Sequence, residues 1–259
     1  MTRFAVALIA GLMLSRDVSA EVRKTDVDIT APNGVTLKGT YSSPGTRGPA
    51  ILLLHGCFSA TNDRHVWDGL AGDLVNAGFH VLTADFRGYG QSHDATTDAA
   101  QQLALRPRWS GDVDVMLNYL LAQEGVDRSR LAAGAVGCSV VEITGLAERR
   151  PGIGALIAIS GASNDAAARY VARTPSLGVF ATAAKYDNAF GWSLAILVNA
   201  STNPRSTLKI FQGSEKSTQL FTKDVRAARE LDLNQTLPEL RPMIVSWLRT
   251  QLASSGSSN

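Results

Sequence analysis

Cysteine and histidine are scarce in this sequence, and opposite charges nearly cancel. The 259 residues include two cysteines and four histidines, and the formal net charge is +2 at pH 7. Two cysteines, Cys57 and Cys138, are too few for a disulfide-rich scaffold and lack the spacing of metal ligands. The small net charge gives no argument for nucleic acid or an anionic membrane as a partner. Internal repeats and phosphate-binding glycine motifs are also missing, and we expect no cofactor and no metal.

The first twenty residues have the pattern of an export signal. Arg3 precedes an apolar stretch over 4–14, and Val18-Ser19-Ala20 forms a small-residue cleavage site. This stretch is shorter than the ~20 apolar residues that cross a bilayer, so we expect no membrane span. We therefore predict a periplasmic or secreted protein that begins at Glu21. Residues 21–252 should form one domain, followed by a disordered tail over 253–259.

The remaining sequence alternates between apolar strands and helix-sized segments. An antiparallel hairpin is expected around the Pro-Asn-Gly turn at 32–34, followed by buried strands and amphipathic helices. The expected strands are 50–56, 80–86, 131–137, 155–161, 177–184 and 207–213, and the expected helices are 65–78, 109–124, 141–149 and 238–252. This order predicts an α/β protein with a mostly parallel, doubly wound sheet, whose sites lie beyond the carboxyl ends of the strands. About fifteen residues separate 155–161 from 177–184, too few for a helical cap.

Five segments, in this order, resemble the α/β-hydrolase superfamily, and within it the small, capless dienelactone-hydrolase-like group. They are LLLHG (52–56), DFRGYGQS (85–92), VGCSVVE (136–142), AAKYD (183–187) and FQGSEKSTQLF (211–221). The resemblance covers nearly all of the expected mature chain. It implies the α/β-hydrolase fold and, by ancestry, hydrolysis of small esters or lactones by acyl transfer. Because one fold hosts many activities, it predicts the fold more firmly than the function.

The resemblance also assigns roles to individual residues. It implies Ser139 as the nucleophile, Asp187 as the acid, and the backbone N–H groups of Cys57 and Val140 as the oxyanion hole. A solvated loop carboxylate is the alternative for Asp187.

Cys138 is the alternative nucleophile. That register would put valines at both positions that must be small, whereas the Ser139 register has Gly137 and fails only at Val141.

For the two cysteines, we favour buried free thiols. The resemblance implies that the strands preceding them are neighbours, so a single disulfide is the alternative.

The general base that the resemblance requires is missing. Lys216 stands where a histidine should follow the last strand, and all four histidines, His55, His65, His80 and His93, precede Ser139. As a base, Lys216 would need its pKa of about 10.4 lowered to near 7, but a neighbouring carboxylate favours the charged ammonium. We therefore expect an Asp187–Lys216 ion pair, with His93 as a weaker candidate base.

Three functions follow. The first is an exported serine hydrolase by ancestry, whose activity is weakened or lost. The second is a working hydrolase of small esters or lactones that uses Lys216 or His93 as its base. The third is a ligand- or partner-binding module on the same fold. Substrate, protein partner and oligomeric state are left open.

Overall fold

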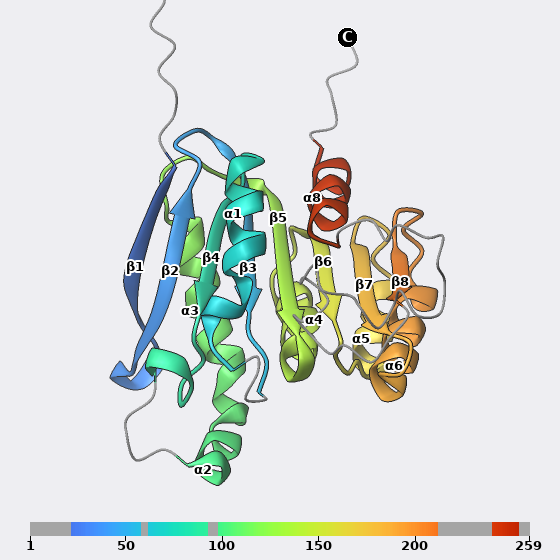
Figure 1. The fold of residues 1–259 in the computed structure, drawn as a ribbon, viewed down its shortest axis with the longest axis horizontal. Coiled ribbons are helices and arrows are strands. Elements are labelled where there is room, and N and C mark those ends of the chain that lie inside the picture. The colour runs from blue at the N-terminus through green and yellow to red at the C-terminus, as the bar shows by residue number, and fades with distance from the viewer. Residues whose placement is uncertain (1–21, 58–61, 93–97, 212–239, 254–259) are drawn as a thin grey trace, which may run out of the picture.

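The computed structural model describes residues 22–57, 62–92, 98–211 and 240–253, which form one eight-stranded sheet with helices on both faces (Figure 1). The strands lie in the order β1-β2-β4-β3-β5-β6-β7-β8. Their bounds are β1 Arg23–Thr30, β2 Thr36–Ser43, β3 Gly48–Leu54, β4 His80–Ala84, β5 Val126–Val136, β6 Ile153–Ile159, β7 Gly178–Ala184 and β8 Thr207–Phe211.

The direction of the strands follows the prediction. β1 and β2 form the expected antiparallel hairpin, and β2 runs antiparallel to β4. All pairings from β4 to β8 are parallel. The hairpin turns at Asn33 and Gly34, which both have positive φ, the backbone region that asparagine and glycine enter most easily. The prediction of a mostly parallel sheet with an N-terminal hairpin is therefore confirmed.

Helices cover the sheet because each one buries an apolar stripe. One face packs against α3, α4, α5 and α6, and the other packs against α1 and α8 (Figure 1). The bounds are α1 Asp68–Asn76, α2 Ala99–Ala104, α3 Trp109–Leu121, α4 Val140–Arg149, α5 Asp165–Ala172, α6 Asn188–Ala200 and α8 Leu240–Gln251. Sequence analysis did not anticipate α2. None of the described helices is long and apolar enough to cross a membrane.

The connection between β6 and β7 contains one short helix and no cap. Residues 160–177 are all described, and α5 is their only helix. This connection leaves the carboxyl ends of β5, β6 and β7 without the helical insertion that many enzymes of this architecture carry. The capless architecture expected from the short spacing is confirmed.

Two buried ion pairs fix the segment that follows β4. The guanidinium of Arg64 and the carboxylate of Asp85 are both almost fully buried and form one pair. The second Asp85 oxygen accepts a 2.7 Å bond from the backbone N–H of Arg64. Arg87 donates to both carboxylate oxygens of Asp112 on α3. A buried charge that loses its partner is strongly destabilising. The two ion pairs therefore hold this segment in one position beside the carboxyl end of β3.

Candidate active site

The connection from β5 to α4 is a sharp turn built on a glycine. β5 ends at Val136, a 3₁₀ turn covers Gly137–Ser139, and α4 begins at Val140. Gly137 has a φ of 65°, in the left-handed region that costs other residues energy. A Cβ placed on it would lie 3.9 Å from the Cα of Gly56 and 4.0 Å from the carbonyl oxygen of Ser160. A side chain at the strained position of the turn would therefore lie in ordinary van der Waals contact with the segments that follow β3 and β6.

Ser139 lies beneath this turn. Its side chain is fully buried, and its hydroxyl oxygen is 2.6 Å from the carbonyl oxygen of His55 and 2.9 Å from that of Val136. A third carbonyl oxygen, that of Leu54, lies 3.4 Å away. The proton of this hydroxyl is held by main-chain carbonyl oxygens, which cannot accept it as a general base would. Ser139 is therefore buried and contacts no base among the described residues, whereas nucleophilic attack requires both exposure and a base.

His55 supplies one of the carbonyl oxygens that Ser139 contacts, and its ring is already engaged. Its Nε2 accepts from the backbone N–H of Phe86 at 2.9 Å, so Nδ1 carries the proton and donates to the carbonyl oxygen of Gly56 at 2.6 Å. The ring is fully buried. His55 therefore fixes the exit of β3, as expected from the sequence, and is not placed to accept the proton of Ser139.

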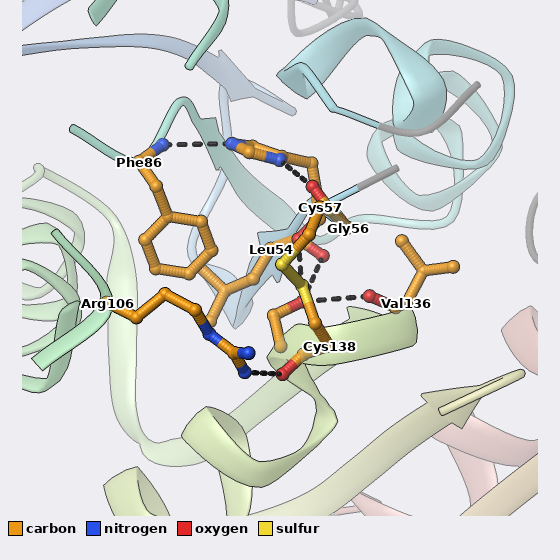
Figure 2. The surroundings of a disulfide bond; sticks show 9 residues. Leu54, Gly56, Cys57, Phe86, Arg106, Val136 and Cys138 are labelled. Atoms are coloured by element: carbon orange, nitrogen blue, oxygen red, sulfur yellow. Dashed lines mark hydrogen bonds between the residues drawn. A yellow bond between two sulfur atoms is a disulfide. The ribbon is translucent and has the colours of Figure 1, made fainter. Parts of the chain in front are cut away.

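Cys57 and Cys138 form a disulfide, so the expectation of two free thiols is wrong (Figure 2). β3 and β5 are adjacent parallel strands with Leu54 paired to Ala135, so both chains leave the sheet at the same level. This register places the two Cα atoms 5.9 Å apart, within bonding range for a disulfide. The structure therefore contains the single disulfide that the expected strand order had left open as the alternative.

The disulfide joins regions that the resemblance assigned to the oxyanion hole. Cys57 follows β3, and Cys138 lies between Gly137 and Ser139 in the turn. The other predicted donor, the backbone N–H of Val140, already donates to the carbonyl oxygen of Gly137. The structure therefore brings Cys57 to the turn as predicted, but Val140 has its N–H engaged inside the turn.

Asp187 lies after β7, where the resemblance placed the acid. It is 5% exposed, so the alternative of a solvated loop carboxylate is wrong. Its Oδ2 atom is buried and has no hydrogen-bond partner in the described part of the chain. The ends of β5 and β7 are separated by β6, which puts about 10 Å of sheet between the turn at Gly137 and Asp187. Asp187 is thus a buried carboxylate with one oxygen left for a further donor.

Ser160 is a site residue that sequence analysis missed. It follows β6, is fully buried, and has a φ of 41°, which is unusual for a residue other than glycine. Its N–H donates to the carbonyl oxygen of Thr182 at 2.8 Å, but its hydroxyl has no partner among the described residues. The only sequence signal was its place near the carboxyl end of the predicted strand 155–161.

Two further residues that the sequence did not indicate, Arg106 and Glu142, lie near the turn that holds Cys138. The Arg106 guanidinium reaches the carbonyl oxygen of Cys138 at 3.5 Å (Figure 2). Burial raises the pKa of Glu142, near the start of α4, and the positive charges of Arg106 and Arg149 oppose that rise. The site therefore holds a partly buried acid and a cation that no motif indicated.

Two predicted residues, Lys216 and His93, lie outside the described residues, so the Asp187–Lys216 ion pair stays a prediction. Within the described ranges, no group of three or more His, Cys, Asp or Glu side chains is placed to hold a metal ion.

Comparison with known proteins supports the fold. Residues 49–138 match the family described as alpha/beta hydrolase fold. An uncharacterized protein of Mycobacterium tuberculosis is 31% identical over 128 residues, which cover 49% of this chain and 42% of that protein. An epoxide hydrolase of Caballeronia sordidicola is 30% identical over 113 residues, 44% of this chain and 31% of that one. The chain thus matches less than half the length of these relatives.

Solved structures cover nearly the whole chain at low identity. An esterase from Pyrococcus furiosus has a TM-score of 0.61 and 12% identity, over 94% of this chain and 96% of its own. The dienelactone hydrolase from Anabaena variabilis has a TM-score of 0.59 and 14% identity, over 89% and 99%. The chain has the α/β-hydrolase fold, so the fold that the resemblance implied is confirmed.

Proposed function

We propose that this protein is an α/β-hydrolase-fold protein, a serine hydrolase by ancestry, whose acyl-transfer activity is weakened or lost. One observation carries the proposal. In this fold, the nucleophile occupies the strained position of the turn between strand and helix. Here the residue in the left-handed conformation is Gly137, while the hydroxyl of Ser139 is buried against carbonyl oxygens.

The local sequence supports this register. Ala135 and Ser139 are then the two small residues that flank the turn position, each two residues from Gly137. The mismatch at Val141 disappears, because that residue no longer needs to be small. The elbow would therefore be complete in its backbone but would lack a nucleophilic side chain.

The missing base supports the same conclusion. No histidine follows Ser139 in the sequence. In a well-studied serine protease, loss of the serine or the histidine lowers turnover by about 10⁶-fold. A chain without a nucleophile at the elbow and without the histidine would keep only what binding and oriented dipoles supply.

Labelling with a fluorophosphonate serine probe tests this proposal. The chain from Glu21 would be compared with Ser139→Ala and Lys216→Ala variants, each shown to be folded. We expect no labelling of any of the three proteins. Labelling of the unmodified chain that disappears in Ser139→Ala would refute the proposal, and loss in Lys216→Ala as well would identify lysine as the base.

Ligand binding without catalysis is the second candidate. The buried Oδ2 of Asp187 and the buried hydroxyl of Ser160 favour it, because unpartnered polar groups at the carboxyl end of a sheet can be satisfied by a bound molecule. A thermal-unfolding screen with small esters, lactones and the matching hydroxy acids tests it. A ligand that raises the Tm should do so much less in Asp187→Asn, and a uniform failure to raise the Tm would count against this candidate.

We also propose that the protein is exported. The charged, apolar and small-residue regions of residues 1–20 support this, although they lie outside the described residues. The disulfide supports it independently, because such bonds persist in oxidising compartments. Fractionation of the expressing cells and N-terminal sequencing should find a protein beginning at Glu21 outside the cytoplasm. An intact Met1 in the cytoplasmic fraction would refute it.

A further inference from the structure

Exposed hydrophobic side chains gather beside the last strand of the sheet. Five large hydrophobic residues are exposed in the described part of the chain, and four of them are Tyr186 (54%), Trp192 (75%), Ile196 (58%) and Ile210 (44%). Trp192 and Ile210 line a shallow groove of about 200 Å³ between α6 and β8. Ile196 lies one turn after Trp192 on α6, and Tyr186 closely precedes that helix. We call these four residues the α6–β8 patch, after the two elements that Figure 1 labels α6 and β8.

The composition of α6 makes the patch unusual. The helix, Asn188–Ala200, has the sequence NAFGWSLAILVNA and contains no charged residue. Leu194 and Leu197 are fully buried in the core, while Trp192 and Ile196 face outward. A surface helix normally carries charge on its outer side, and an outward apolar face marks an interaction surface.

In the described part of the chain, the charged side chains that line the grooves on the two faces of β8 are all positive. Lys185 lines the groove, and Arg205 and Lys209 line the opposite side of β8. All three are exposed, and none of them makes an ion pair with a described residue. No acidic side chain lines either side of β8 in the described ranges, and the nearby carboxylate of Asp187 is buried. The patch is therefore apolar with one lysine in its groove, and two further cations lie on the other face of the edge strand β8, although the whole chain is almost neutral.

We propose that the α6–β8 patch docks onto the surface of an anionic lipid bilayer. Tryptophan and tyrosine favour the boundary between headgroups and acyl chains, and an apolar helix face can enter that boundary without spanning the membrane. Lys185 in the groove would meet the negative headgroups, and Arg205 and Lys209 would add attraction from the adjoining edge of the sheet. A second copy of the chain fits less well, because the Lys185 ammonium groups of the two facing patches would repel each other. This inference is independent of whether the site is catalytic.

Vesicle co-sedimentation tests the proposal with the full mature chain. Vesicles of phosphatidylglycerol and phosphatidylcholine in equal parts would be compared with vesicles of phosphatidylcholine alone. We expect binding to the anionic vesicles that weakens in high salt. The double variant Trp192→Ser/Ile196→Ser should bind more than about tenfold more weakly. Lys185→Gln and Lys209→Gln should each weaken binding by about fivefold.

Matched controls separate docking from unfolding. Val22→Ser removes an exposed hydrophobic residue, 50% exposed, that lies at the far end of the chain and should leave binding unchanged. All altered side chains are exposed, so thermal unfolding should show every variant folded. Brominated acyl chains should quench Trp192, because Trp67 and Trp109 are fully buried and the half-buried Trp247 packs on the opposite face of the sheet. Trp192→Phe should remove most of this quenching.

Three results would overturn the proposal. The first is no binding of the unmodified protein to anionic vesicles. The second is equal binding of the Trp192→Ser/Ile196→Ser variant. The third is a concentration-dependent dimer in light scattering that this variant abolishes, which would assign the patch to a second copy of the chain.

Discussion

The hydroxyl oxygen of Ser139 lies 2.6 Å from the main-chain carbonyl oxygen of His55. This contact ties the turn after β5 to the end of β3 and gives Ser139 a structural role. Ser139→Ala should lower the free energy of unfolding by about 1–2 kcal/mol, because a buried hydrogen bond is lost. Urea denaturation measures this, with Ser176→Ala as an exposed control expected to change little. An unchanged or higher stability for Ser139→Ala would contradict the structural role.

Two glycines near the turn should respond differently to alanine. Gly137→Ala places a methyl group at ordinary van der Waals distance from its neighbours and should cost about 1 kcal/mol of stability for the left-handed backbone alone. Gly161→Ala would drive its methyl group into the side chain of Val140 and the carbonyl oxygen of Gly137, so it should cost more, about 3 kcal/mol. Chemical denaturation compares the pair. A greater loss of stability for Gly137→Ala than for Gly161→Ala would show that the turn position cannot accommodate a methyl group.

The disulfide closes a loop with a sequence separation of 81 residues. Replacing both Cys57 and Cys138 by serine should lower the free energy of unfolding by about 2–4 kcal/mol. Reduction of the unmodified protein by a phosphine should produce a similar loss. Iodoacetamide under denaturing conditions should label no cysteine before reduction and two after it, as read by mass spectrometry. Labelling before reduction would restore the expectation of free thiols.

Protonation of His80 should make the free energy of unfolding depend on pH. Its Nε2–H donates to the carbonyl oxygen of Thr46 at 3.0 Å, and its Nδ1 accepts from the hydroxyl of Tyr41 at 2.7 Å. Burial lowers the pKa of His80 below its ordinary 6.5. The unfolded chain therefore binds a proton first, so stability is fully present above about pH 6.5 and falls as the pH drops through the lowered pKa. Unfolding between pH 5 and 8 should show this slope, and His80→Gln should reduce it. A matching reduction in the exposed control His65→Gln would contradict the assignment.

Glu142 should give the opposite slope. Burial raises its pKa above the ordinary 4.5, so the folded protein holds this proton longer than the unfolded chain does. Stability should therefore decline as the pH rises from about 4.5 through the raised pKa. Glu142→Gln should be more stable than the unmodified protein at pH 7 and should lose this slope, whereas the exposed control Glu124→Gln should do neither. Equal behaviour of the two variants in denaturation curves would rule out the burial effect.

The parts of the fold that were predicted correctly are those that local sequence patterns indicate. Continuous apolar runs such as 50–56 and 155–161 are recognisable because a strand covered on both faces needs them. The boundaries shifted by a few residues, as at β5, which begins at Val126 rather than at 131. The helix α2 was missed because six residues without a clear apolar period give no signal.

The candidate site was predicted less completely than the fold. The end of β7 correctly located Asp187, but its burial depends on elements far away in the sequence. The motif VGCSVVE was interpreted with Ser139 or Cys138 at the turn position, and neither register anticipated that Gly137 would occupy the left-handed position. Ser160 and Glu142 carry no motif, and only their surroundings make them notable.

The sequence by itself determined the alternation of strands and helices, the absence of a cap and the absence of a histidine after Ser139. These are properties of segment lengths, apolar runs and residue order, which need no long-range contact. Tertiary structure alone decided which residue of the turn is strained, whether Ser139 faces the site, and that Cys57 reaches Cys138. These depend on the register of β3 against β5 and on backbone dihedral angles, because a shift of one residue in a tight turn reverses which side chain points outward.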